Sequence, residues 1–383
     1  MRTYIKYFFL LVCLFLHSTM LMASKEIQKA HMSGEIRIDN VSATKELRIE
    51  YSNGDVDLFF WNKDYILLIY DETATASTKK QAEDFLNQRN LEQRGNDEAH
   101  TLKIRQTSLT DRYNVSIESK WTLYVPIKQK SVYVVNFYGN ISVGEGYDKQ
   151  IRAEVRHGDF YMTKTKAMCM VIVERGNFSV GEAGYLNLNT SYANGTVGFA
   201  NVLNLSCGHA QSIMIDKVQD LNLHNCQHSK VKIGQLKNAK VVASYSEILA
   251  SDVLGTAIVN NVRYSGISLT NLCGWCNFSD ISYSQINVKV SKTNREPKVL
   301  VPDARFSGVV VSIPKTLQLS CLLRSRNGKI EFDVPASVKQ HVVESTKDYS
   351  QTRIHTLLNT TSFTSSAVID IQNSNGNIGI KAY

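Results

Sequence analysis

Two cysteines separated by two residues, Cys273 and Cys276, form the sharpest chemical motif of the chain. Such a pair can exchange disulfides or bind a metal, but redox activity favours a helix N-terminus and zinc requires further ligands. Here the motif lies where the sequence pattern predicts a strand, and the chain has no second C-x-x-C pair. We therefore expect structural residues, either disulfide-bonded to each other or packed as small core side chains, and neither a metal nor a cofactor.

Three Tyr-Ser pairs recur every 19 residues, and their rings belong to Tyr245, Tyr264 and Tyr283. A step of one structural repeat would align these rings along one edge of the molecule. An exposed aromatic row can contact sugar rings or a partner protein, and stacked rings also stabilise repeat structures without any ligand. Both interpretations remain open, and the three tyrosines are the candidate ligand-binding residues.

Two carboxylates raise the possibility of polysaccharide cleavage, which requires acids and bases that converge on one face. Asp216 and Asp252 are 36 residues apart, or two repeats. They would lie roughly 9–10 Å apart if they shared one column. No column of arginine or lysine accompanies them, and the chain has no HExxH, GxSxG or phosphate-binding glycine motif. We expect solvated carboxylates and no catalytic residues.

The elements that must position these residues are repeats of about 18 residues, in which a small or polar corner precedes an apolar residue. One such unit cannot bury its apolar face alone, so the period predicts a solenoid. A second apolar column begins at Leu186-x-Leu188 and continues to Ala257-x-Val259. The residues expected to stack as one inward column are Ile141, Phe160, Phe178, Val197, Ile213, Val231, Ile248, Ile267 and Ile286.

The distribution of proline divides the chain into regions, because all five prolines lie outside 131–296 and proline cannot donate to a strand ladder. We expect the repeats to occupy 131–295. Regions 24–130 and 296–383 should complete the stack and cover its ends, where bare strand edges would recruit other strands. One amphipathic helix is expected over 77–92.

The first 23 residues resemble an export signal, with Arg2 and Lys6 before an apolar run and Ala23 at the cleavage point. Cleavage would lower the formal net charge from +8 to +6. Export predicts an oxidising compartment and argues against a nucleic-acid partner, as does the absence of basic runs interleaved with aromatic residues.

The order of several short motifs is specific to one family. An Asn-Gly strand pair at 47–56 is followed by Val-Pro-Ile-Lys at 125–128, by glycine-marked repeats, and by Ser-Arg-Asn-Gly-Lys-Ile at 325–330 and Ser-Asn-Gly-Asn-Ile at 374–378. Over residues 35–383 the chain resembles the bacterial putative-adhesin family of unknown function, whose members are similar to auto-transporter adhesin heads. The resemblance implies a right-handed parallel β-helix, a cell-envelope location and an adhesion role. It supplies no catalytic or ligand-binding motif.

The sequence therefore predicts an exported, non-enzymatic structural or binding protein of the bacterial envelope. Its location would be the periplasm, the outer membrane surface or the extracellular space. Its partners would be envelope glycans or another surface protein, and any contact with the membrane would be peripheral. The alternatives are a carbohydrate-active β-helix enzyme and a scaffold or regulatory partner of another envelope protein.

Overall fold

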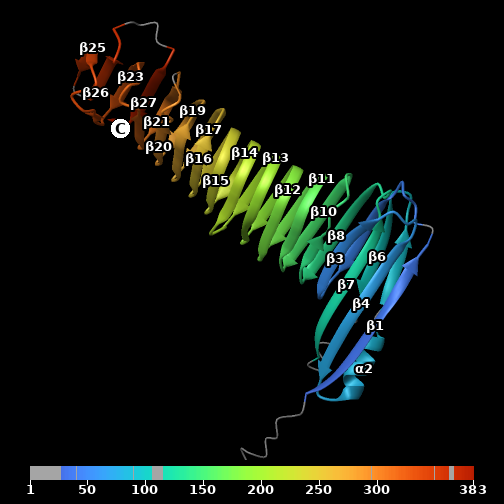
Figure 1. Ribbon diagram of the computed structural model, residues 1–383. Coiled ribbons are helices and arrows are strands. Elements are labelled where there is room, and N and C mark those ends of the chain that lie inside the picture. The colour runs from blue at the N-terminus through green and yellow to red at the C-terminus, as the bar shows by residue number, and fades with distance from the viewer. Residues whose placement is uncertain are drawn as a thin grey trace, which may run out of the picture.

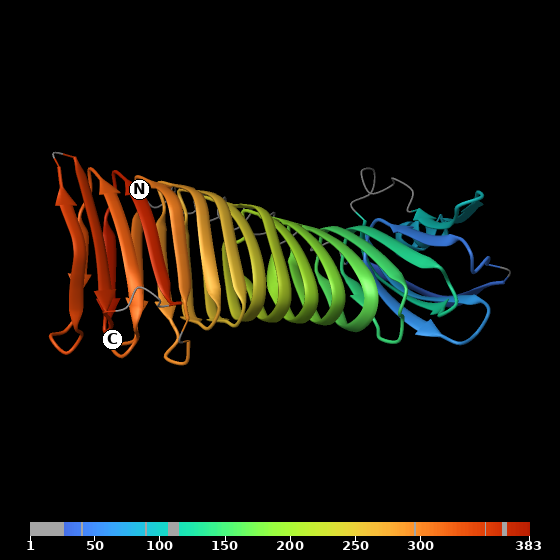
Figure 2. The same ribbon diagram turned by 90° about the horizontal axis from the view of Figure 1, so that it is seen from above.

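A computed structural model of the chain describes residues 27–39, 41–88, 90–105, 115–294, 296–348, 350–361 and 366–383. Within these ranges the chain forms 28 strands and one helix, and all the strands belong to one large sheet in which most pairs are parallel. The molecule is elongated, with the longest antiparallel strands and the helix at one end (Figures 1 and 2). The expected export signal at 1–23 lies outside the described residues.

The N-terminal region combines antiparallel and parallel pairing. Strand β4 pairs with β1 and β7 in antiparallel fashion, whereas β2 and β3 run parallel to the strands stacked on them. The elements of this region are β1 (Gln28–Ile38), β2 (Glu46–Tyr51), β3 (Asp55–Trp61), β4 (Ile66–Ala76), α2 (Lys79–Asn87), β5 (Asn90–Gly95), β6 (Ala99–Arg105) and β7 (Ser116–Pro126).

Helix α2 is shorter than the expected 77–92. It begins at Lys79 because the hydroxyl of Thr78 caps it by accepting a hydrogen bond from the Gln81 amide. Its end differs because residues from Asn90 onward pair with β6 as a strand. The buried face of the helix, including Phe85, packs with alanines of β1 and β4 in a small separate core.

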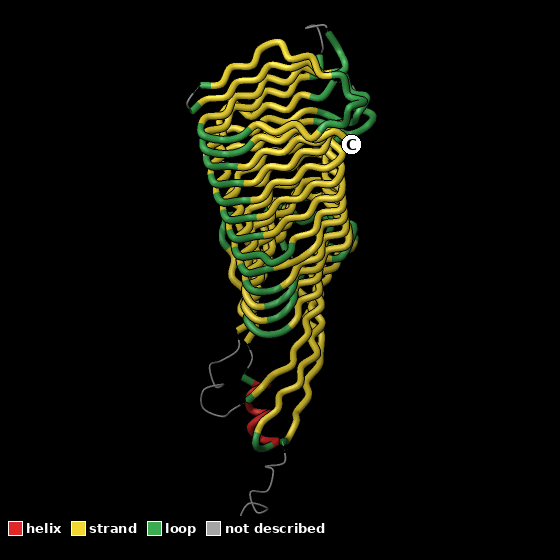
Figure 3. Tube along the Cα trace, turned by 90° about the vertical axis from the view of Figure 1, so that its left-hand side faces the viewer, coloured by secondary structure: helices red, strands yellow, loops and turns green. Residues whose placement is uncertain are grey.

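The central region is a stack in which each strand pairs in parallel with the strand one repeat away. The turns of successive repeats lie above one another (Figure 3). The strands are β8 (Ser131–Tyr138), β9 (Ile141–Val143), β10 (Gln150–His157), β11 (Phe160–Glu174), β12 (Asn177–Ser191), β13 (Asn194–Gly208), β14 (Ile213–Gln227), β15 (Lys230–Ser244), β16 (Glu247–Val253), β17 (Thr256–Arg263), β18 (Gly266–Leu272), β19 (Trp275–Ser282) and β20 (Gln285–Val290).

The last strands of the chain turn back into the stack. Strand β27 lies between β21 and β23, and β28 lies between β22 and β24, in parallel on both sides. Antiparallel strands β26 and β25 follow β23 at this end. The strands are β21 (Lys298–Arg305), β22 (Gly308–Ile313), β23 (Leu319–Arg326), β24 (Ile330–Asp333), β25 (Gln340–Lys347), β26 (Gln351–Leu358), β27 (Val368–Ser374) and β28 (Ile378–Ala382).

All nine residues expected in the inward column are buried, but Val197 does not share the column of the others. Strand pairing places Gly195 opposite Phe178 and Ile213, while Val197 pairs with Val180 in the next inward column. A side chain at Gly195 would meet the Phe178 ring at 2.6 Å, so the large ring fills the space that glycine leaves.

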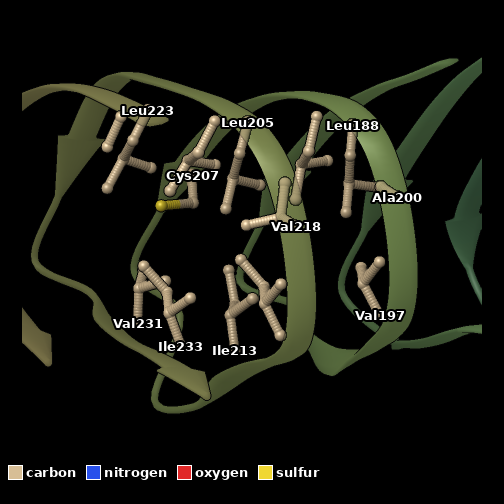
Figure 4. Packing of buried hydrophobic residues seen from close by; sticks show 14 of the residues in the cluster. Leu188, Val197, Ala200, Leu205, Cys207, Ile213, Val218, Leu223, Val231 and Ile233 are labelled. Atoms are coloured by element: carbon tan, nitrogen blue, oxygen red, sulfur yellow. The ribbon is translucent and has the colours of Figure 1, made fainter. Parts of the chain in front are cut away.

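The second apolar column is confirmed. Leu188, Leu205 and Leu223 pair in succession and pack across the core from Val197, Ile213 and Val231 (Figure 4).

Candidate ligand-binding ladder

The tyrosines Tyr245, Tyr264 and Tyr283 stack on one another at one corner of the repeats, with ring centroids 4.9 Å apart. The stack is longer than the sequence interpretation indicated. In the described residues it runs through seven rings whose neighbouring centroids are 4.6–5.0 Å apart and whose planes differ by 2–11°. We call this set the corner ladder: Tyr192, His209, His228, Tyr245, Tyr264, Tyr283 and Phe306.

Four of the seven rings escaped the sequence analysis because residue identity and spacing both vary along the ladder. The available signal was an aromatic residue directly before a small one. It occurs as Tyr192-Ala193, His209-Ala210, His228-Ser229 and Phe306-Ser307. The same corner also holds a second stacked pair, Tyr138 and His157, at 5.0 Å. By strand register, Arg175 falls between this pair and Tyr192.

Each ring points outward because its backbone turns the corner in the left-handed region. The φ angles of the seven ladder residues lie between 48° and 56°. This conformation costs an L-residue roughly 1–2 kcal/mol, and asparagine tolerates it better than an aromatic residue. Beyond Phe306 the corner continues as Asn375 and Asn327, whose side chains hydrogen-bond at 2.9 Å.

A row of buried serines supports the ladder from within. This serine row comprises Ser229, Ser246, Ser265, Ser284 and Ser307. The hydroxyl of Ser265 donates to the Arg263 carbonyl at 2.8 Å and accepts a hydrogen bond from the Ser246 amide at 3.1 Å. The same pattern recurs at Ser284 and Ser307. The serines therefore satisfy backbone groups at every corner and fix the position of each ring.

The parallel stacking decides what the ladder offers to a ligand. Ring faces within the ladder are covered by their neighbours, so sugar rings cannot stack on them face to face. The exposed parts are ring edges and tyrosine hydroxyls, with Tyr192, Tyr245, Tyr264, Tyr283 and Phe306 each 49–57% exposed. Aromatic edges carry partial positive charge and attract oxygen atoms, and phenols donate hydrogen bonds. The ladder thus suits a partner with oxygen atoms along a line.

The charges beside the ladder are mostly paired. Lys230 and Glu247, each two residues after a ladder ring, form an ion pair between neighbouring repeats. Arg305, just before Phe306, is paired with Asp303 at 2.8 Å. The ladder therefore has no strong field of one sign and should bind through ring edges and hydroxyls.

The carboxylates Asp216 and Asp252 do not share a column, contrary to the expected geometry. Asp216 lies next to Gly234 on the following strand, whereas Asp252 pairs with Gln235. Asp252 accepts a hydrogen bond from Asn271 at 2.6 Å. No pair of converging carboxylates arises from these two residues.

Cys273 and Cys276 are both free thiols, so the disulfide that their spacing allows is not formed. Cys276 points inward at the start of β19, and burial raises its pKa well above the usual range. Cys273 precedes the strand and is partly exposed, with its sulfur 3.6 Å from the Asn271 carbonyl. The two side chains have different environments because Gly274 and Trp275 turn the chain between them.

Two hollows lie in the N-terminal part of the stack. One of about 370 Å³ is bordered by Tyr161, and the other, of about 530 Å³, is bordered by lysines that include Lys128 and Lys164. These two lysines are paired with Asp64 and Glu182. The pairing leaves the larger hollow without a concentrated positive charge. Among the described residues no cluster of three or more His, Cys, Asp or Glu is placed to hold a metal ion.

The structure defines an all-β protein with a large, mostly parallel sheet. No family model matches the chain, and no curated protein matches it. It is weakly similar to a solved structure described as a putative cell adhesion protein from Clostridium sporogenes, with 10% identity over 93% of this chain and 100% of that one, and a TM-score of 0.21. It is also weakly similar to one described as a putative lipid binding protein from Parabacteroides distasonis, with 13% identity over 91% and 96% of the two chains, and a TM-score of 0.25. At these scores neither neighbour decides the fold or the function.

In the described part of the chain, no helix has the length and apolar character needed to cross a membrane.

Proposed function

We propose that this protein is a non-enzymatic binding protein of the bacterial cell envelope, an adhesin built as a right-handed parallel β-helix. Its contact surface is the corner ladder, which engages an extended partner such as an envelope polysaccharide or a surface protein. The observation that carries this proposal is the set of seven exposed rings held at left-handed corner positions.

An energetic comparison supports a binding role. Each stacked aromatic pair contributes about 0.5–1.5 kcal/mol, and each left-handed aromatic residue costs roughly 1–2 kcal/mol. The six pairs and seven strained residues therefore nearly cancel, and the rings add little to folding stability. Asparagine fulfils the same corner role in this chain at Asn327 and Asn375 at lower strain. Contact with a partner explains why rings occupy the other corners.

The N-terminal sequence supports export, and we assign the protein to the periplasm, the outer membrane surface or the extracellular space. Regions 24–130 and 296–383 would cover the two ends of the β-helix at 131–295. Antiparallel strands at both ends are consistent with this role, because they pair with stack strands that would otherwise present free edges. Cell fractionation with an antibody to the mature chain tests the location, and recovery only from the cytoplasm would contradict it.

The binding experiment compares the mature protein with a variant that lacks three rings, Tyr245→Asn, Tyr264→Asn and Tyr283→Asn. Asparagine keeps the corner conformation, so the circular dichroism spectrum should remain unchanged. A screen of envelope polysaccharides and surface proteins should find a ligand whose affinity falls at least about tenfold in the variant, which corresponds to roughly 1.4 kcal/mol.

The matched control for this experiment changes three exposed apolar side chains away from the ladder: Met214→Ser, Leu254→Ser and Trp275→Ser. This control should bind like the wild type. Equal binding by the asparagine variant would remove the ladder as the contact surface. Cleavage of a polysaccharide that Asp216→Asn or Asp252→Asn abolishes would replace the non-enzymatic proposal with a carbohydrate-active enzyme.

A further inference from the structure

Two buried cysteines lie in contact on neighbouring repeats behind the corner ladder. Cys207 in β13 and Cys226 in β14 have their Sγ atoms 2.9 Å apart, and their side chains are 1% and 0% exposed. They precede His209 and His228 by two residues each, so they lie behind the two stacked imidazoles. The sulfur of Cys207 points into the core among the leucines and valines (Figure 4).

A local irregularity creates this contact. Strands β13 and β14 pair in register at Leu205 and Leu223, and uniform register would place Cys207 opposite Asn225. The register shifts by one residue between Leu205 and Gly208, and Asn225 takes a left-handed φ of 56°. A β-bulge of this kind re-aims the next side chain. Here it directs the Cys226 thiol inward, toward Cys207.

We propose that Cys207 and Cys226 form a disulfide that joins two successive repeats at the centre of the corner ladder. The bond would hold together the two repeats that carry His209 and His228. It is separate from the Cys273/Cys276 motif, whose thiols lie in different environments. Its formation in the cell depends on the export proposed above, whereas its formation in a purified sample does not.

The oxidant for this reaction is a low-molecular-weight disulfide such as oxidised glutathione. Cys207 attacks it first during folding, forms a mixed disulfide and releases one glutathione thiol. The Cys226 thiolate then attacks the Cys207 sulfur, and the second glutathione leaves as a thiolate that takes up a proton. One disulfide is reduced and one is formed. The adjacent Cys207 thiol lowers the pKa of Cys226, which favours the attacking thiolate.

A peptide map tests the assignment directly, because trypsin cleaves after Lys217, between the two cysteines. Peptide 176–217 contains Cys207 as its sole cysteine, and peptide 218–230 contains Cys226 as its sole cysteine. After refolding with oxidised glutathione and blocking of free thiols, mass spectrometry should find these two peptides joined. Reduction should separate them. Recovery of both peptides in the blocked, unlinked form would overturn the proposal, as would linkage of either to another cysteine.

A second measurement does not depend on the folding of a variant. The oxidised wild-type protein should melt about 2–6 °C above the same protein in reductant, as expected for a closed loop of this length in a chain of this size. The control Cys321→Ser removes a buried cysteine in β23 and should keep both the linked peptides and the shift. Cys226→Ala should lose both. Equal melting temperatures with and without reductant would contradict the proposed bond between repeats.

Export and cross-linking are separated by one further comparison. Protein isolated from cells with thiols blocked at lysis should contain the linked peptides if the chain is exported. A link found only in the refolded sample would support the disulfide and contradict the proposed location.

Discussion

Replacement of Tyr264 separates two opposed contributions to the stability of the ladder. Its ring lies 4.9 Å from both Tyr245 and Tyr283, and its φ is 51°. Tyr264→Ala removes both ring contacts and keeps the backbone strain, so it should cost about 1–3 kcal/mol. Tyr264→Asn removes the same contacts but relieves about 1 kcal/mol of strain. The asparagine variant should therefore be more stable than the alanine variant by about 1 kcal/mol.

Urea unfolding followed by circular dichroism measures this difference, provided that the variants show equal dependence on urea. The matched control is Tyr161, which is similarly exposed but lies within β11 outside the left-handed region. There Tyr161→Asn should be no more stable than Tyr161→Ala. If asparagine has no advantage at Tyr264, or has the same advantage at Tyr161, the argument that the corner strains its aromatic residues is wrong.

Three further outcomes are expected. Ile248→Ala in the inward column should lower the unfolding free energy by about 2–5 kcal/mol, and a loss below 1 kcal/mol would contradict its core position. The hydrogen bond from Lys103 lowers the pKa of Glu50 below 4.5, so this carboxylate stabilises the fold above pH 4.5 and loses that effect on acidification. Glu50→Gln should accordingly weaken the pH dependence of stability below pH 4.5, as measured by urea unfolding at several pH values. The purified protein should not reduce insulin, and the double change Cys273→Ser and Cys276→Ser should leave binding intact; reduction that this variant loses would show a redox role.

The repeat of the sequence was sufficient to predict the strands and most of the inward residues, because alternation and period are both set by burial. It was insufficient at Gly195, since a glycine has no apolar side chain to mark its position in the column. The ring of Phe178 on the neighbouring strand fills that space instead. The same limit applies to helix α2, whose end is decided by the pairing of Asn90–Gly95 with β6.

The ladder was predicted only where its residues are identical. Tyr245, Tyr264 and Tyr283 recur at one spacing, whereas His209 and His228 occupy equivalent corners with another residue type. Unequal repeats also explain the failure at Asp216 and Asp252. Asp216 lies next to Gly234, but the following step is only 17 residues, as in the pairing of Ile233 with Ala250. A count of residues alone cannot reveal such changes in register.

The serine row makes each corner dependent on its immediate neighbours alone. The Ser246 amide is satisfied by the next serine along the row, and the Tyr245 amide donates to a carbonyl of the same neighbouring repeat. Duplication of residues 246–264 would therefore insert one complete unit, add one ring and leave both ends of the protein unchanged. Each such unit lengthens the surface by the spacing between strands, about 4.8 Å. The reach of this protein along a partner is thus set by a number of units, and gene duplication or deletion can adjust it without redesign of the core.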